Sequence, residues 1–452
     1  MSEFDLVIRG GTVVTPDEVI AADIGIAEGR IAALQSGLSG SARETINATG
    51  LHIFPGLIDS HVHFNEPGRA HWEGFETGSR ALAAGGGTLF FDMPLNAHPP
   101  TLDATSFDQK LAAAEATSLV DFAFWGGLVP GNLDRLEELS DRGVVGFKAF
   151  MCNSGIEDFA HADEQTLREG MKRAAGLNKI VAVHAESETI TSQLAQAALA
   201  HGKTSARDYL DSRPILAELR AISLAVEIAA DTGCALHIVH VSCGIGVAHI
   251  VEAQQKGVNV TCETCPHYLV LTEEDVLRLG ARAKCAPPLR PKPDQEQLWQ
   301  HLKEEHITTI GSDHSPSPPE MKEDTSFFKV WGGIAGIQHT LPLLLSEGHV
   351  ERGVALPLLS RLTSFNVAQR FGLPLNKGRL ALGADADFAL VDLSQALTIK
   401  AENLLDRHRQ TPYLGRKLTG KVVQTILRGQ PVFREGEAVS NPIGRLVKPL
   451  KT

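Results

Sequence analysis

The stretch IFPGLIDSHVHF, residues 53–64, decides the fold class. It has the length and apolar character of a buried strand, and it ends in polar residues. His61 and His63 are two positions apart, so in a strand both side chains leave the same face. Seven further apolar β-type runs follow it, at residues 87–94, 120–128, 144–150, 179–186, 235–242, 258–266 and 307–315.

Amphipathic helical segments lie between these runs, for example residues 75–86, 106–117 and 215–233. Eight β-runs that alternate with helices predict an α/β protein, a (β/α)8 TIM barrel with insertions. A doubly wound open sheet is the alternative, but no G-x-G-x-x-G sequence follows a strand. The barrel is therefore the preferred fold.

Both ends of the chain differ from the barrel segment in their pattern, because they have short strands of alternating polarity and Gly-rich turns. Neither end has enough apolar area to fold alone, so we expect them to pair as one small β-sandwich domain. The predicted organisation is residues 1–52 and 371–452 in the β domain, with the barrel at 53–370 inserted between them.

Composition excludes several classes of function. Lys plus Arg number 42 and Asp plus Glu 54, a net charge of −12, which argues against a nucleic-acid partner. No apolar run approaches the ~20 residues of a membrane helix, and the N-terminus does not resemble a signal peptide. Six cysteines in 452 residues are typical of buried thiols in a reducing compartment, so we expect a cytoplasmic protein without membrane attachment.

Chemistry-bearing residues recur at the carboxyl ends of five predicted strands: His61 and His63, Lys148, His184, His240 and Asp313. In a parallel barrel these ends share one face, where active sites form. A single histidine in an apolar strand is more often a hydrogen-bonded core residue, and His-x-His alone is only moderately specific for metal. A lysine in an apolar run is more unusual, since a buried ammonium is costly. The recurrence over five strand ends favours a shared metal site.

With these residues in place, the chain resembles the cyclic-amide hydrolase branch of the amidohydrolase superfamily. That branch includes dihydroorotases, hydantoinases or dihydropyrimidinases, and allantoinases, and the similarity spans nearly the whole chain. The motifs are most similar to those of the allantoinases at residues 66–78 (EPGRAHWEGFETG), 92–96 (DMPLN) and 331–336 (WGGIAG).

The resemblance implies two divalent metal ions. The ligand set suits Zn²⁺ best, and Fe²⁺, Mn²⁺ or Co²⁺ would also fit. His61, His63 and Asp313 would hold the first ion, and His184 and His240 the second. Lys148, as N6-carboxylysine, would bridge them together with a hydroxide. Asp313 would also be the catalytic acid–base group. Asn153 occupies the place of the oxyanion-binding tyrosine of hydantoinases.

Three activities compete within this branch. Dihydroorotases carry a carboxylate-binding arginine two positions after the second histidine, where this chain has Asn65. Hydantoinases and dihydropyrimidinases hold their ring largely through main-chain groups, so they are the alternative to an allantoinase that converts allantoin to allantoate. A metal-free scaffold relative is the remaining alternative, and the intact ligand set argues against it.

The resemblance also implies a homo-oligomer, a tetramer by analogy, and a small-molecule substrate as the main partner.

Candidate contacts to a ring amide and its polar arm come from several segments. His267, after the seventh strand, is expected to line the pocket. The candidate substrate-binding residues are Asn96, Asn153, Ser154, Ala286, Ser315 and Trp331.

Overall fold

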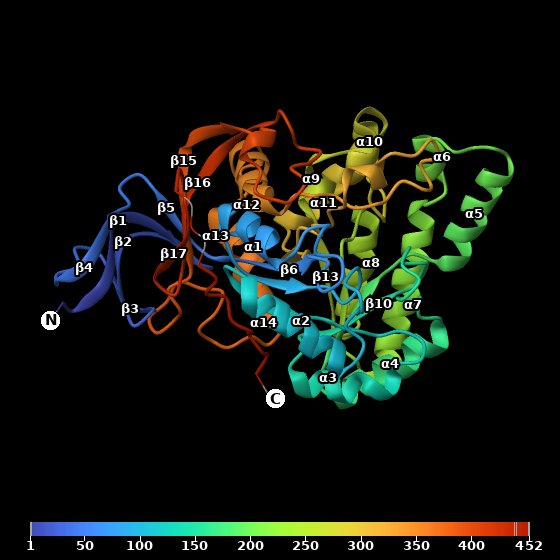
Figure 1. The fold of residues 1–452 in the computed structure, drawn as a ribbon, viewed down its shortest axis with the longest axis horizontal. Coiled ribbons are helices and arrows are strands. Elements are labelled where there is room, and N and C mark those ends of the chain that lie inside the picture. The colour runs from blue at the N-terminus through green and yellow to red at the C-terminus, as the bar shows by residue number, and fades with distance from the viewer. Residues whose placement is uncertain (1, 438, 440, 451–452) are drawn as a thin grey trace.

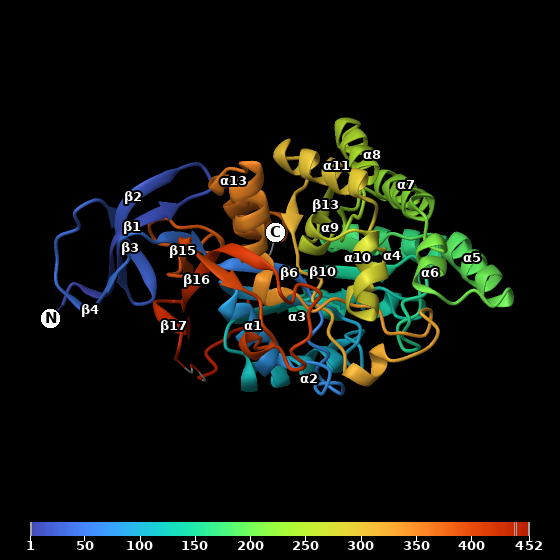
Figure 2. The ribbon, with the colours of Figure 1, turned by 90° about the horizontal axis from the view of Figure 1, so that it is seen from above.

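The computed structural model describes residues 2–437, 439 and 441–450 of the chain. Two parts are visible in Figure 1: an α/β barrel, and a sheet that carries the N-terminus at the end remote from helices α5 to α7. The view from above shows the same order along the long axis (Figure 2).

Eight parallel strands form the barrel. β8 and β9 are separated only by Trp125 and act as one strand, because β8 pairs with β7 and β9 pairs with β10. A parallel bridge between Val62 and His314 closes the ring between the first and last strands. The strands are β6 (Leu57–Val62), β7 (Gly87–Asp92), β8 (Asp121–Phe124), β9 (Gly126–Gly127), β10 (Gly146–Phe150), β11 (Ile180–His184), β12 (Leu236–Ile238), β13 (Val260–Thr264) and β14 (Thr309–Ile310).

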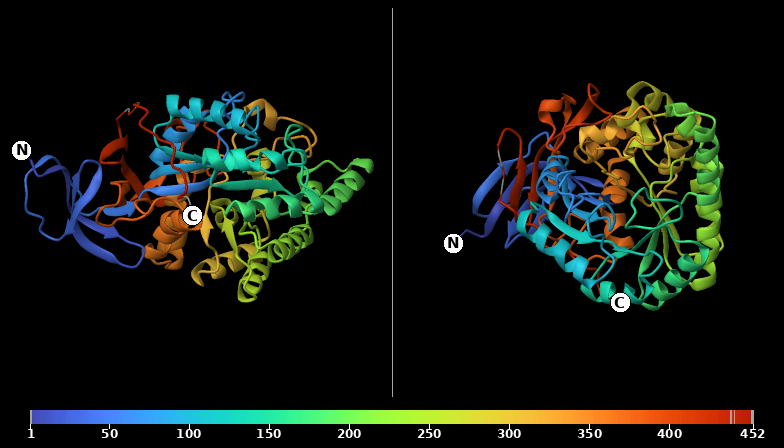
Figure 3. Two further views of the ribbon diagram at one scale, coloured as in Figure 1. Left: turned by 90° about the horizontal axis from the view of Figure 1, so that it is seen from below. Right: turned by 45° about the vertical axis from the view of Figure 1, so that its right-hand side comes forward.

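Helices surround these strands, as the right-hand view of Figure 3 shows. Their apolar faces pack on the strands, and residues such as Leu167, Ile222 and Leu298 are fully buried. The helices are α1 (Phe75–Ala84), α2 (Ala104–Thr117), α3 (Leu136–Arg142), α4 (Glu164–Gly176), α5 (Glu188–Ala200), α6 (Ala206–Asp211), α7 (Ile215–Thr232), α8 (Gly244–Gln255), α9 (Pro266–Val270), α10 (Glu273–Leu279), α11 (Lys292–Lys303), α12 (Thr340–Leu343), α13 (Leu356–Ser360) and α14 (Asn366–Arg370).

The second part is a sheet built from both ends of the chain. Its strand order is β17-β16-β15-β5-β1-β2-β3, and β4 pairs with β1. The strands are β1 (Phe4–Val14), β2 (Val19–Ala27), β3 (Arg30–Gln35), β4 (Ala42–Asn47), β5 (His52–Pro55), β15 (Phe388–Thr398), β16 (Lys417–Leu427) and β17 (Gln430–Arg434). The predicted fold class, a (β/α)8 barrel with a β domain made by both chain ends, is confirmed.

β5 joins the two parts directly. It pairs with β1 and with β15, and a single glycine, Gly56, separates it from barrel strand β6. The domain limits expected from the sequence, at 52/53 and 370/371, stay a prediction. Among the described residues, no helix is long and apolar enough to cross a membrane.

Candidate active site and metal centre

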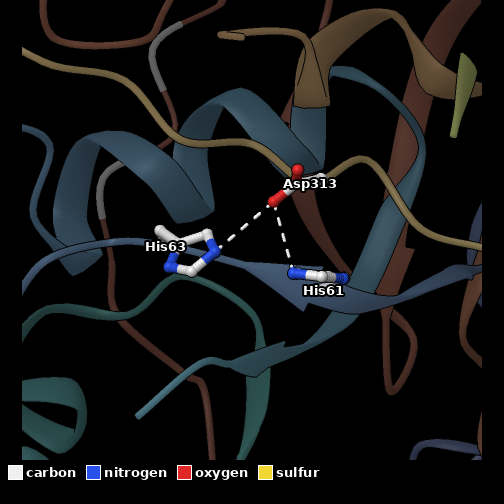
Figure 4. A group of neighbouring side chains, drawn as sticks. All are labelled: His61, His63 and Asp313. Atoms are coloured by element: carbon white, nitrogen blue, oxygen red, sulfur yellow. Dashed lines mark ion pairs between the residues drawn. The ribbon is translucent and has the colours of Figure 1, made fainter. Parts of the chain in front are cut away.

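The first group of candidate ligands comes from the two strands that close the barrel. His61 on β6 and His63 just after it are buried, and Asp313 after β14 has a side chain only 14% exposed. The Oδ1 atom of Asp313 lies 3.2 Å from His61 Nε2 and 3.4 Å from His63 Nε2 (Figure 4). Three ligand atoms thus converge on one point, which is the arrangement a divalent cation requires.

The second group comes from β11 and the residues after β12. His184 ends β11, and its Nδ1 lies 3.1 Å from Nε2 of His240. The ring centroid of His240 is 5.4 Å from that of His61, so the two groups are neighbours. Burial lowers the pKa of both His184 and His240, which keeps their imidazoles in the neutral form that binds metal.

Lys148 lies within β10 and is fully buried. Its Nζ has no hydrogen-bond partner among the described residues. Burial lowers the pKa of the ammonium to about 7, against the opposing effect of the nearby carboxylates of Asp313 and Glu263. A buried amine without a partner is an expensive group, and carboxylation with metal binding would remove that cost.

Two buried carboxylates that the sequence analysis did not single out fix the orientation of the imidazoles. Glu263 on β13 accepts a hydrogen bond from Nδ1 of His61 at 2.8 Å. Glu186 accepts one from Nε2 of His184, also at 2.8 Å. Because each neutral histidine keeps its one ring proton on the nitrogen that donates to a carboxylate, its other ring nitrogen presents a lone pair to the site.

The surroundings of these unprotonated nitrogens show whether the site suits a metal ion. His61 Nε2 then faces a carboxylate oxygen of Asp313, and His184 Nδ1 faces another imidazole nitrogen. Lone pairs and carboxylate oxygens repel one another unless a cation or a proton lies between them. The residues present therefore fit divalent metal ions. Glu186 was detectable in the sequence, since it lies two positions after His184 at the same strand end.

Backbone strain supports a functional role for two of these residues. His240 has a φ of 41° and Asp313 a φ of 46°, in the left-handed region that non-glycine residues seldom occupy. Such conformations cost about 1–3 kcal/mol and persist at functional sites where surrounding structure imposes them. His240 contacts His184, and Asp313 contacts His61 and His63.

A cavity of about 420 Å³ opens above this centre. Four histidines and Asp313 are among its lining residues, whereas Lys148 is fully buried. The fully buried His267 is not among the cavity-lining residues, so the expectation that it lines the pocket is wrong; helix α9, which begins at Pro266, takes it into the core instead. All six predicted substrate-binding residues line the cavity: Asn96, Asn153, Ser154, Ala286, Ser315 and Trp331.

These six residues differ in the hydrogen-bonding groups they offer. The hydroxyl of Ser154 donates to the main-chain oxygen of Phe159 at 2.7 Å, so it holds its own loop. Asn153 accepts from the amide of Gly155 through Oδ1, which leaves its NH₂ group to act as a donor. The indole Nε1 of Trp331 is buried without a partner among the described residues. Of these groups, the NH₂ of Asn153 is the donor that stays available to a polar ligand.

Arg213 is a lining residue that the sequence analysis missed. Its guanidinium forms an ion pair with Glu186 and packs 5.6 Å above the ring of Tyr209. Burial would raise the pKa of Glu186, but Arg213 and the hydrogen bond from His184 lower it to about 2. Glu186 is therefore an anion that links the cavity wall to the candidate ligand His184.

Comparison with known proteins identifies the family. The model of the amidohydrolase family matches residues 52–432. The chain belongs to the amidohydrolase family. Its barrel and β domain are those the resemblance led us to expect.

Curated relatives of this family member cover its whole length. It is 55% identical over 449 residues to a protein of Rubrobacter xylanophilus named allantoinase, with 99% of this chain and 98% of that protein covered. A protein of Deinococcus radiodurans with the same name is 53% identical over 445 residues, covering 98% and 99%.

Solved structures of related amidohydrolases have the same fold. The L-hydantoinase (dihydropyrimidinase) from Arthrobacter aurescens superposes with a TM-score of 0.96 at 34% identity, covering 98% of this chain and all of that one. The dihydropyrimidinase from Brevibacillus agri gives a TM-score of 0.92 at 33% identity, with 99% of each chain covered.

Proposed function

We propose that this protein is an allantoinase, a cyclic-amide hydrolase that opens the hydantoin ring of allantoin and releases allantoate. The observation that carries this proposal is the identity of 55% and 53%, over nearly full length, to proteins named allantoinase. The structural neighbours named hydantoinase are only about a third identical, although they share the fold. Fold alone does not choose among ring substrates.

Two divalent ions, most compatible with Zn²⁺ and also with Fe²⁺, Mn²⁺ or Co²⁺, are the proposed cofactors. His61, His63 and Asp313 would hold the first ion, and His184 with His240 the second. Lys148, as a carbamate, would add oxygen ligands to this set. When bound, two divalent ions make hydroxide available near neutral pH and polarise a carbonyl group.

The chain's own residues then prepare and complete the hydrolysis. Glu263 and Glu186 hold His61 and His184 in the tautomers that leave Nε2 and Nδ1 free. Asp313 accepts the proton of the attacking water and returns it to the ring nitrogen that leaves. Since Oδ1 of Asp313 faces the two imidazoles, Oδ2 is the oxygen that would carry this proton.

The cavity supports an uncharged, polar ring substrate. The NH₂ group of Asn153 would donate to the oxyanion that forms at the attacked carbonyl. The side chains of Asn96, Ser315 and Trp331 offer further contacts for the ureido arm. Main-chain groups near Ala286 would hold the ring amide.

Hydantoinase or dihydropyrimidinase activity is the alternative, favoured by the TM-score of 0.96 to the Arthrobacter enzyme. A panel of allantoin, hydantoin, dihydrouracil and dihydroorotate on the metal-loaded protein separates the two. Allantoin should give the highest kcat/KM. A higher kcat/KM for dihydrouracil would overturn the assignment of allantoin as the substrate, while leaving the proposed hydrolytic mechanism in place.

We further propose a cytoplasmic homotetramer with the domain ranges 1–52, 53–370 and 371–452. All six cysteines are buried and free, which supports a reducing compartment. The tetramer rests on the resemblance alone, and light scattering after gel filtration would test it.

A further inference from the structure

We propose that His301, Glu304 and His306 form an additional, peripheral site for a zinc-type divalent ion, outside the active site. The Nδ1 atoms of the two histidines face each other at 3.0 Å. The Oε2 atom of Glu304 lies 3.3 Å from His306 Nδ1 and 3.9 Å from His301 Nδ1. Three potential ligand atoms from one short segment thus converge within 4.8 Å of one another.

The backbone holds this segment in its converging shape. α11 ends at Lys303, and Glu305 then turns the chain with a φ of 60°. The amide of His306 donates to the carbonyl oxygen of His301 at 3.0 Å, which closes the turn. Arg361 holds the other side by donating to Glu305 at 2.6 Å. A metal would therefore bind donors that are already positioned, at little cost in conformational entropy.

The donor set is one that zinc prefers. Two imidazoles and a carboxylate leave a fourth tetrahedral position for water. Between two imidazole nitrogens 3.0 Å apart there is room for one shared proton, whereas a cation satisfies both lone pairs and the carboxylate together. Burial and the neighbouring His306 lower the pKa of His301, which favours its neutral, metal-binding form. The three side chains are 19%, 44% and 35% exposed, so an ion can reach them from solvent.

The site lies apart from the proposed catalytic centre. Residues 301–306 precede β14 (Thr309–Ile310), whereas Asp313 follows the same strand at its carboxyl end. None of the three residues lines the active-site cavity. An ion here would link the end of α11 to the segment that leads into β14. It would stabilise the barrel without taking part in hydrolysis.

Zinc counting on the full-length protein tests the proposal. The wild type is saturated with Zn²⁺, freed of loose ions by gel filtration and analysed by inductively coupled plasma mass spectrometry. We expect about one more zinc per chain than in the double variant His301→Asn/His306→Asn. Zinc should also raise the thermal midpoint of the wild type more than that of the variant, with unchanged kcat.

A matched control is His201→Asn, which removes an exposed histidine whose Nδ1, within the described part of the chain, bonds only the carbonyl of Ala197. This control should keep the wild-type zinc count. Glu304→Gln, at an exposed carboxylate, provides a second variant that should also lose the additional ion. Equal zinc counts in the wild type and the double variant would overturn the proposal, and neither result depends on which ring substrate is hydrolysed.

Discussion

At the scale of single residues, the site depends on carboxylates that orient imidazoles. Glu263 accepts a hydrogen bond from His61, and Glu186 accepts one from His184. Each proposed metal position therefore has its own buried carboxylate. Such outer partners fix the tautomer and ring orientation of a ligating histidine. Their loss should therefore act on one metal position at a time.

Replacing Glu186 with Gln tests this at the second position. The amide cannot act as an anion for both His184 and Arg213, so His184 loses its fixed tautomer. Affinity for the second ion should fall about 10–100-fold, the usual effect of losing such a partner. Metal counting during chelator titration should show one ion released early and the other retained, with kcat lowered in parallel.

Glu169→Gln is the control, because Glu169 bonds only the exposed Gln165 among the described residues. If Glu186→Gln releases both ions together, or neither, Glu186 does not orient the second position specifically.

Lys148 supports a prediction about pH. Carbamate formation needs the neutral amine, and burial lowers the pKa of Lys148 from 10.5 to about 7. With dissolved carbon dioxide held constant, the rate of reactivation of the metal-stripped protein should rise about tenfold per pH unit below pH 7 and level off above it. For a lysine with an unperturbed pKa, the rate of reactivation would keep rising beyond pH 9.

Two variants accompany this pH series. Lys148→Ala should hold at most one ion and recover no activity. Lys179→Ala, which removes another partly buried lysine remote from the centre, should reactivate like the wild type. A fully loaded and active Lys148→Ala protein would rule out the bridge.

At the scale of elements, three loops are tied together beside the cavity. His98, in the loop after β7, donates from Nδ1 to Asp158, in the loop after β10, at 2.7 Å. Arg69, in the loop after β6, reaches the same carboxylate at 3.8 Å and donates to the carbonyl of Asn96. The cavity residues Asn96, Asn153 and Ser154 lie within these loops, so Asp158 holds the cavity wall.

We expect Asp158→Asn to loosen that wall without disturbing the metals. Partly exposed ion pairs contribute about 0.2–1 kcal/mol, so KM should rise by up to about fivefold. Steady-state kinetics should show this rise with little change in kcat, and metal content should equal that of the wild type. Glu157→Gln, at the exposed neighbouring carboxylate, should behave as the wild type; equal KM values for both variants would contradict the role of Asp158.

At the scale of the whole molecule, a buried charge network joins the barrel to the β domain. Lys377 lies 2.7 Å from Asp121 on β8 and 2.7 Å from Asp387, just before β15. Asp385 lies 2.9 Å from the same ammonium, and Arg428 also pairs with Asp121. Burial acts to lower the pKa of Lys377, but these carboxylates outweigh it and raise the pKa well above its usual value.

Lys377→Met should destabilise the protein strongly. It takes the buried ammonium away from Asp385 and Asp387, while Asp121 keeps Arg428, and breaking such a buried pair costs about 3–5 kcal/mol. The thermal midpoint at pH 7 should fall, and part of the loss should disappear at acidic pH, where the carboxylates bind protons. Lys400→Met, at an exposed lysine, should leave the midpoint unchanged. Metal content and kcat at low temperature should match those of the wild type.

The sequence alone predicts the barrel strands, because each is a local apolar run followed by a change of polarity. It also determined the six candidate ligands, since the carboxyl ends of parallel strands must share one face. The predicted helices at 75–86, 106–117 and 215–233 correspond to α1, α2 and α7 with small shifts at their ends. All of these features are encoded within a few consecutive residues.

Which side chains contact one another is visible only in the three-dimensional structure. Glu263 bonds a histidine 202 positions away, and Lys377 joins carboxylates from two parts of the molecule. His267 was assigned wrongly because the turn of α9, rather than its place in the sequence, sets its direction. Hydrogen bonds and ion pairs act over a few ångströms in space, and a distance of that kind is fixed only when the strands close into a barrel.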